Sequence, residues 1–384
     1  MALLLAAVVA NRARAGDDAV ADGDSATPPP RSATTEAERS TATTTDPRPG
    51  RPTTTAAGST TEATATLGPR LPSPSGTTLV VATSNRLVIA HLDTGTVRTL
   101  DLVTEVQGGQ PFEAVTDVGD AFLVGGERPR LVPRAAGATV ERSDLPSYSA
   151  FLPSSLEGRF WTVEPRFDLE LVEWTLEGET GRRLELPGGE GRVLPFGDRF
   201  LISPAGSMMA VDPTTGRAER IGDGIAVAVD AQTLVRTRCD ESLECGLVLS
   251  DLDGGDERAV GPPTPRSRYD TYAGGRFSPD GRWLVIPFFG EDQPGGLALV
   301  DVVRGERRPT DSLTTLSGGG FPPAATFSAD SRWLLIADPS GSDELKAIDL
   351  ADGTRVAVDL GTLASDGDGM VLSAFPSIPA DAEH

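Results

Sequence analysis

Short apolar runs follow one another along the chain from about residue 77 almost to the C-terminus. They are rich in valine, isoleucine, leucine and threonine, as in TTLVVA at 77–82 and RLVIAH at 86–91, and glycine, aspartate, asparagine or proline separates them. Runs of this kind are typical of β-strands. No stretch keeps a helical spacing of apolar residues for more than about two turns. This part of the chain is therefore predicted to be all-β.

A turn that ends in glycine recurs through the same region, at Gly95, Gly137, Gly181, Gly216, Gly255, Gly305 and Gly353. The spacing is close to the roughly 40 to 50 residues that one four-stranded blade of a β-propeller occupies. We predict a seven-bladed β-propeller, with each glycine in the turn between the third and the outermost strand, where a positive φ angle costs glycine little. Six blades are the alternative, because blades two and four are weakly patterned.

The last blade has the clearest pattern, with strands predicted at 324–328, 332–338, 345–350 and 354–360. The first blade lacks an inner strand, and one spare apolar run remains at 369–377. If this run completes blade one, the two ends of the domain hydrogen-bond to each other and no sheet edge is left open. The ring is therefore predicted to close through a C-terminal strand.

The sequence before the strands differs in composition. Residues 1–16 begin with MALLLAAVVA and look like the remnant of a signal or membrane-anchor segment, although about 20 apolar residues are needed to span a bilayer. A disordered N-terminus of a cytoplasmic protein is the alternative. Residues 17–76 are rich in Thr, Ala and Pro and bury too little apolar surface to offset their ordering entropy, which predicts a disordered stalk. The propeller is expected over 77–378, with a disordered tail at 379–384.

Two hairpins carry a more specific signal, FSPDGRWLVI at 277–286 and FSADSRWLLI at 327–336. They resemble the Phe-Ser-Pro-Asp-Gly hairpin of WD-repeat-like β-propellers of the TolB type, while the other blades share only the period. The Trp-Asp dipeptide and the His-containing tetrad of the true WD repeat are absent. The resemblance implies a binding or assembly surface outside the cytoplasm and carries no catalytic residue to any position. The stalk and the Ala, Arg, Asp and Gly bias resemble an actinobacterial envelope protein.

The chain contains two cysteines, Cys239 and Cys245. Their spacing fits neither the C-x2-C half of a zinc site nor a thioredoxin-type redox pair. Cys239 ends one predicted strand and Cys245 begins the next, so the two lie near opposite positions of a hairpin. We predict a disulfide between them, and a free thiol pair is the alternative. A disulfide agrees with an oxidising compartment, so an extracytoplasmic location, secreted or membrane-anchored, is expected.

Charge and histidine content narrow the function further. The 34 basic and 56 acidic side chains give a formal net charge of −22, which repels the phosphate backbone and argues against a nucleic-acid partner. The two histidines, His91 and His384, offer little material for acid–base catalysis or metal binding, and His91 is expected to pack half-buried. No hydrolase elbow, phosphate loop or dinucleotide motif is found, so no cofactor is predicted.

Acidic pairs and tryptophans are the remaining candidates for a site. The acidic pairs could offer oxygens to calcium but match no calcium loop and are interpreted as solvated surface; they are Glu291 with Asp292, Asp366 with Asp368, and Asp253 with Asp256. Trp283 and Trp333 occupy equivalent positions on second strands. They are expected to pack between blades rather than to contact a substrate.

Two functions fit these observations. The first is a non-catalytic extracytoplasmic binding or scaffold module for a protein, glycan or cell-wall ligand, present as a monomer with a possible N-terminal membrane tether. The second is a carboxylate-based hydrolase or lactonase, with or without a metal, in the central channel. The second needs several carboxylates converging on the axis, where the predicted inner strands place only Glu113, Asp117 and Asp230. The binding module is expected, with no catalytic, cofactor-binding or metal-binding residues.

Overall fold

The structure is a computed structural model of the 384-residue chain. Two compact units divide the chain between Thr53 and Thr54, and every described residue belongs to the second unit. The structure describes residues 62–66 and 71–377, apart from gaps at 84–85, 102–114, 126–128, 135–138, 147–149, 155, 157, 165–169, 188–192, 240–244, 261–270, 273, 290–295, 309–323, 338–343 and 361–370.

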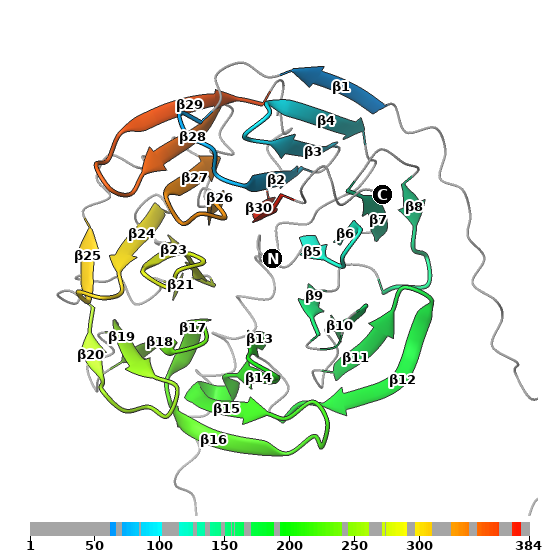
Figure 1. Cartoon of the computed structure of the whole chain (residues 1–384). Helices are drawn as coiled ribbons and strands as arrows, with labels where there is room; N and C mark the ends of the chain where they lie inside the picture. Colours follow the sequence, from blue (N-terminus) through cyan, green and yellow to red (C-terminus); the bar gives the residue numbers. More distant parts are fainter. Residues whose placement is uncertain are drawn as a thin grey trace, which may run out of the picture. The chain divides into compact units, whose positions relative to one another are not determined.

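Seven antiparallel sheets follow one another around a common axis and form a seven-bladed β-propeller (Figure 1). The predicted all-β fold is therefore confirmed, and the blade count is seven rather than six. Helical structure in the described residues is confined to the short 3-10 turn η1, Pro204–Gly206. In the same residues no helix has the length and hydrophobicity of a membrane span.

Blades two to four each contain four consecutive strands, ordered from the axis outward. Blade two comprises β5 (Val115–Asp117), β6 (Ala121–Val124), β7 (Arg130–Pro133) and β8 (Val140–Glu141). Blade three comprises β9 (Ala150–Pro153), β10 (Arg159–Glu164), β11 (Glu170–Thr175) and β12 (Gly178–Glu185). Blade four comprises β13 (Val193–Phe196), β14 (Arg199–Ile202), β15 (Ser207–Val211) and β16 (Ala218–Asp223).

Blades five to seven continue the ring. Blade five comprises β17 (Ile225–Val229), β18 (Thr233–Cys239), β19 (Cys245–Asp251) and β20 (Arg258–Ala259). Blade six has two short inner strands, β21 (Thr271–Tyr272) and β22 (Arg276–Phe277), which both pair with β23 (Trp283–Phe289), followed by β24 (Gly296–Asp301) and β25 (Glu306–Arg308). Blade seven comprises β26 (Ala324–Phe327), β27 (Trp333–Ala337), β28 (Glu344–Asp349) and β29 (Arg355–Asp359). The predicted strands of blade seven agree with these bounds to within one residue at each end.

Blade one joins the two ends of the propeller. Its outward-running strands are β2 (Thr77–Ala82), β3 (Arg86–His91) and β4 (Thr96–Asp101), and its inner position is taken by β30 (Val371–Pro376). β30 runs antiparallel to β2, from Pro376 opposite Thr77 to Val371 opposite Ala82. The predicted closure by a C-terminal strand is thus confirmed.

A further strand, β1 (Glu62–Thr66), lies at the outer edge of blade one. It pairs antiparallel with β4, from Glu62 opposite Leu100 to Thr66 opposite Thr96. These residues fall within the segment 17–76, which composition predicts to be a disordered stalk. Main-chain hydrogen bonds to an exposed sheet edge need no apolar side chain, which explains why a hydrophobic pattern does not reveal this strand.

The hydrophobic core lies between neighbouring blades. Trp283 of blade six is 3% exposed and belongs to one buried cluster with Phe327 of blade seven. Trp333 of blade seven is 1% exposed and shares a cluster with Leu79 of blade one and Leu372 of β30. The two tryptophans therefore pack between blades, as expected. Neighbouring blades pack against both faces of a sheet, so middle strands such as β24 and β27 are buried along their whole length rather than at alternate residues.

Most of the predicted turn glycines lie between third and outermost strands. Positive φ angles are found there at Gly95, Gly216, Gly305 and Gly353. In blade five the positive φ, 79°, belongs to Gly254 rather than to the neighbouring Gly255. Gly137 lies outside the described residues.

The prediction for Gly181 is wrong. The turn of blade three lies between β11 and β12, immediately before Gly178, and Gly181 lies inside β12 with a φ of 82°. The register between β11 and β12 shifts at this point, between Val172 and Trp174. The left-handed conformation of Gly181 is therefore used in a β-bulge rather than in a turn.

Candidate functional site

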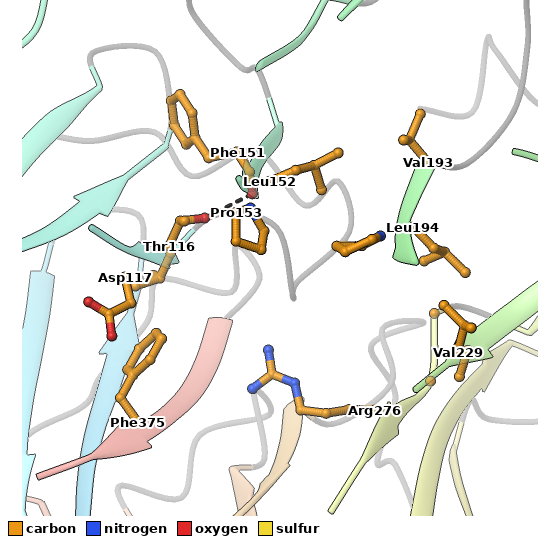
Figure 2. A pocket seen from close by; sticks show the side chains of 15 residues that line it. Thr116, Asp117, Phe151, Leu152, Pro153, Val193, Leu194, Val229, Arg276 and Phe375 are labelled. Carbon is orange, nitrogen blue, oxygen red and sulfur yellow. Dashed lines mark hydrogen bonds between the residues drawn. The ribbon is translucent and has the colours of Figure 1, made fainter. Parts of the chain in front are cut away.

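A cavity of about 340 Å³ lies at the inner strands of blades two to six and of β30 (Figure 2). This axial cavity has a volume at the low end of the range for small-molecule sites, about 300–1,000 Å³. Ten of its lining side chains are apolar: Val115, Phe151, Leu152, Pro153, Val193, Leu194, Pro195, Ala228, Val229 and Phe375. The polar side chains of the described wall are those of Thr116, Asp117 and Arg276.

Arg276 supplies a cation to this wall. Figure 2 shows its side chain reaching from the inner strand of blade six into the space between the strands. Nη1 of Arg276 donates a 2.7 Å hydrogen bond to Oγ1 of Thr326 on β26, which ties the guanidinium to blade seven. Burial lowers the pKa of Arg276 to about 10, because desolvation disfavours the charged form. The side chain therefore still carries its charge at neutral pH.

The glycine before Arg276 allows blades five and six to approach each other closely. The N–H of Gly275 donates a 2.8 Å hydrogen bond to the carbonyl of Val227 on β17. A Cβ atom at Gly275 would lie 2.9 Å from Cδ1 of Leu284 and 3.1 Å from Cβ of Ala228. Contacts this short require the neighbours to move, so glycine is needed here. This contact places the next residue, Arg276, at the cavity.

Asp117 is the carboxylate of the described wall, and it was predicted to lie near the axis. It forms an ion pair with Arg134 and accepts a 3.0 Å hydrogen bond from the N–H of Gly119. The guanidinium of Arg134 lies 4.6 Å from the ring centre of Phe122, a cation–π contact that helps to hold it. In Figure 2 the carboxylate of Asp117 points away from Arg276. The negative charge of Asp117 is therefore balanced by Arg134.

The other two acids predicted near the axis add no carboxylate to the described wall. Asp230 accepts hydrogen bonds from the N–H groups of Gln232 (2.8 Å) and Thr233 (2.6 Å) in the turn after β17, a local turn contact. Glu113 lies outside the described residues. The convergent carboxylates that a hydrolase would need are not found among the wall residues that the structure describes.

Cys239 and Cys245 form the predicted disulfide. They are paired directly opposite each other at the open end of the β18–β19 ladder in blade five. The five residues that connect them lie outside the described part of the chain. The bond closes a short hairpin loop and agrees with an oxidising compartment.

The internal histidine and the acidic pair of blade five do not build a metal site. His91 ends β3 half-buried, with its Nδ1 3.1 Å from Oγ1 of Thr78. Asp253 lines a second cavity of about 210 Å³ together with Arg236 and Arg238. Both guanidinium groups pair with Glu257, and two cations at one site oppose calcium binding.

The remaining candidates lie where the structure makes no statement. Glu291 with Asp292, Asp366 with Asp368, and His384 are all outside the described residues. Within those residues, no group of three or more His, Cys, Asp or Glu side chains could hold a metal ion. Arg276 carries no sequence motif, and neither composition nor spacing separates it from the other arginines of the chain.

No protein-family model and no curated protein matches the sequence. Solved structures do match. A provisionally assigned 6-phosphogluconolactonase from Bacteroides fragilis is 13% identical, with 80% of this chain and 100% of that chain covered and a TM-score of 0.53. AztD from Citrobacter koseri is 11% identical (78% and 98% covered, TM-score 0.45), and TolB from Acinetobacter baumannii is 13% identical (77% and 82% covered, TM-score 0.43). The likeness to the Bacteroides structure indicates a shared fold, and an identity of 13% leaves the function open.

Proposed function

We propose that this chain is a non-catalytic, extracytoplasmic binding module that holds a ligand in the axial cavity. The composition of the wall supports this proposal, since ten apolar side chains surround one guanidinium and one carboxylate that Arg134 already balances. A largely apolar wall with few polar groups can exclude water from a ligand and still orient it, which is how most small-molecule sites are built.

A carboxylate-based hydrolase or lactonase receives less support. Hydrolysis by paired carboxylates needs one acid and one base or nucleophile on opposite sides of the reacting bond. In the described wall, Asp117 has no second carboxylate beside it and is held by Arg134 and Gly119 rather than presented to the cavity.

The disulfide supports the extracytoplasmic part of the proposal, because such bonds form and persist mainly in oxidising compartments. The disulfide can be tested by mass spectrometry of the protein, extracted from its native cells in the presence of excess maleimide. With Cys239 and Cys245 oxidised, no maleimide is added before reduction and two are added afterwards. Two additions without reductant would place the chain in a reducing compartment.

Binding of the neutral dye N-phenyl-1-naphthylamine to the oxidised full chain tests the use of the cavity, because its fluorescence rises in apolar surroundings. We expect a saturable signal from the native chain. Leu194→Trp and Val229→Trp each add an indole to the wall and should abolish this signal. Val303→Trp is the control, because Val303 is 68% exposed in the turn after β24 and lies outside the cavity.

Two results would overturn the proposal. Full dye binding by both cavity variants would place the apolar site elsewhere on the chain. Hydrolysis of a δ-lactone or a 4-nitrophenyl glycoside by the native chain, abolished by Asp117→Asn, would show that the cavity is catalytic.

A further inference from the structure

The second cavity, of about 210 Å³, lies between blades four and five, and we call it the interblade cavity. Blade four contributes the end of β16, which includes Gly222. Blade five contributes Arg236 and Arg238 of β18 and Asp253 of the turn before β20. The volume lies below the range of about 300–1,000 Å³ for drug-sized ligands, so a ligand of this cavity must be small.

Arg236 brings a buried cation to the interblade cavity. Its side chain is 4% exposed, and its Nη2 donates a hydrogen bond to the carboxylate of Glu257. Nε is buried and has no hydrogen-bond partner among the described residues, and none of them accepts a hydrogen bond from Nη1. Buried N–H donors are nearly always satisfied, by protein, water or a ligand. Arg236 therefore keeps donors for an acceptor that the cavity supplies.

Two glycines of blade four make room for this guanidinium. A Cβ atom at Gly222 would lie 2.8 Å from Nη1 of Arg236 and 3.2 Å from Cε of Met208. A Cβ atom at Gly224 would lie 3.5 Å from Cδ of Arg236. The side chain of Arg236 thus rests against the backbone at the end of β16. This contact places Nη1 beside Gly222, which itself lines the cavity.

The charges of the interblade cavity are balanced only in part. The carboxylate of Glu257 accepts hydrogen bonds from Nη2 of Arg236 and, at 3.0 Å, from Nη1 of Arg238. One anion between two cations leaves a net positive charge on these three side chains. Asp253 lies in the same wall, and no described residue pairs with its carboxylate. The cavity therefore presents one positive and one negative charge that the described side chains do not neutralise locally.

This pair of charges favours one class of ligand. A simple anion would be attracted by Arg236 and repelled by Asp253, and a simple cation would meet the reverse. Asp223, the other acid of the wall, already pairs with Arg220. A zwitterion satisfies both charges at once. Because it has no net charge, the formal net charge of −22 on the full chain does not repel it.

We propose that the interblade cavity binds a small zwitterion, with its carboxylate on the guanidinium of Arg236 and its ammonium group on the carboxylate of Asp253. The planar N–H donors of a guanidinium match the oxygens of a carboxylate, and an ammonium group donates to carboxylate oxygens. Two sources offer this chemistry, an α-amino acid with a short side chain and an ω-amino acid. The site is separate from the axial cavity and does not depend on the function proposed for it.

Calorimetric titration of the oxidised full chain with alanine, β-alanine, propionate and ethylamine at neutral pH tests the proposal. Propionate lacks the ammonium group of the two amino acids, and ethylamine lacks their carboxylate. We expect the better amino acid to bind about two- to fivefold more tightly than propionate, because Asp253 is exposed and its ion pair is screened. It should bind about ten- to a hundredfold more tightly than ethylamine, because Arg236 is buried. The order of alanine and β-alanine separates the two sources.

Variants connect the preference to the two charges. Asp253→Asn should bring the affinity ratio of amino acid to propionate to one or below. Asp198→Asn is the matched control, because Asp198 is exposed in the turn between β13 and β14 and lies outside the cavity. Gly222→Ala should weaken the binding of amino acid and propionate alike by about tenfold or more, because the new Cβ displaces the guanidinium. Neither Asp253→Asn nor Gly222→Ala removes the buried arginine, so the fold is expected to persist in both.

The outcomes separate this inference from the function proposed for the axial cavity. Equal binding of both amino acids and propionate by the native chain would overturn the preference for a zwitterion. A preference that persists in Asp253→Asn would overturn the assignment of the ammonium group. Absence of binding by every probe would overturn the site and leave Arg236 as a contact between blades. Leu194→Trp, in the axial cavity, should change none of these affinities.

Discussion

Single side chains explain why the two hairpins resemble each other in sequence. Oγ of Ser278 and Oγ of Ser328 each accept a 2.9 Å hydrogen bond from the N–H of the tryptophan five residues later. Gly281 and Ser331 occupy the same left-handed position, with φ angles of 70° and 62°. A serine is strained there, yet Oγ of Ser331 accepts the N–H of Asp280 from blade six at 2.9 Å. The departure from glycine in blade seven therefore provides a contact between blades.

A glycine between blades four and five should be irreplaceable. Gly224 has a φ of 112°, and a Cβ atom there would lie 2.6 Å from the carbonyl oxygen of Thr237. We expect Gly224→Ala to lower the free energy of unfolding by roughly 2–4 kcal/mol, measured by urea denaturation. Gly246→Ala is the matched control, because no atom lies within 4 Å of its added Cβ and its change should stay within about 0.5 kcal/mol. Similar losses in both variants would contradict the steric argument.

The side-chain pair after β8 predicts how stability depends on acid. Nε and Nη2 of Arg142 donate hydrogen bonds of 2.8 and 2.7 Å to the carboxylate of Asp144 and lower its pKa. A folded-state pKa below the unfolded value, about 3.9, means that Asp144 stabilises the fold above that pH and loses its contribution as the pH falls through the lower value. Asp144→Asn should therefore cost up to about 1 kcal/mol at pH 7, because the group is partly exposed.

Urea denaturation of both chains at pH 7 and near pH 3 measures this effect. The difference in unfolding free energy between the native chain and Asp144→Asn should shrink at the lower pH. A difference that stays constant or grows would show that the ion pair is not its source.

The strands differ in how accurately the sequence pattern predicts them. Blade seven is predicted to within one residue because its apolar runs coincide with its strands. Blade three contains a buried charge in an otherwise mostly apolar strand. The side chain of Glu173 on β11 is fully buried and forms ion pairs with Arg159 (3.1 Å) and Arg182 (3.3 Å). A buried carboxylate is tolerated when such partners satisfy it, and these partners come from neighbouring strands rather than from the local sequence.

The outer strand β1 is predicted to protect the edge of β4. Ala63 and Thr64 are neighbours in this strand, and alternate residues of an edge strand direct their N–H groups to the partner. One of these two neighbours must therefore donate its N–H to β4. Replacing both by proline removes that hydrogen bond whichever of the two donates it, and should leave the edge of β4 open. We expect a loss of roughly 1–2 kcal/mol in unfolding free energy and concentration-dependent self-association in sedimentation velocity.

Two prolines at Ala56 and Ala57, outside the described residues, serve as the control for chain stiffness. They should change neither stability nor association. If the variants at Ala63 and Thr64 behave like this control, the pairing of β1 with β4 contributes nothing measurable.

The entire ring depends on one pairing between segments far apart in the sequence. β30 pairs with β2, and Leu372 of β30 is completely buried in the cluster that also contains Leu79 and Trp333. β30 also contributes Phe375 to the axial cavity. Closure of the fold and construction of the site therefore share one strand.

Removal of residues 371–384 should open the ring. The loss of an inner strand exposes the edge of β2 and part of the core, so we expect the Tm to fall by roughly 10 °C or more and N-phenyl-1-naphthylamine binding to disappear. Removal of residues 379–384 alone is the control and should leave the Tm unchanged. An equal Tm for the two truncated chains, measured by calorimetry, would show that β30 does not close the ring.

Local patterns were sufficient for the all-β class, seven blades, the closing strand and the disulfide. Each depends on features that repeat or lie close together in the chain: apolar runs, turn residues at a blade period, and two cysteines in one hairpin. The physical requirements of strands, turns and hairpins can therefore be recognised in short segments of the sequence, without knowledge of tertiary contacts. The pattern was insufficient at Gly181, because a glycine with a positive φ angle can lie in a β-bulge as well as in a turn, and the sequence does not distinguish the two.

The pairing of β1 and the content of the axial cavity followed from the assembled ring instead. β1 pairs through its backbone, which has no side-chain pattern to detect. Arg276 is one arginine among many in the sequence, and it becomes distinctive only because the assembled ring brings it to Thr326 and to the cavity that Val229 and Phe375 also line. These residues belong to different blades, and their meeting depends on the arrangement of all the inner strands around the axis, a long-range property that no local stretch of sequence encodes.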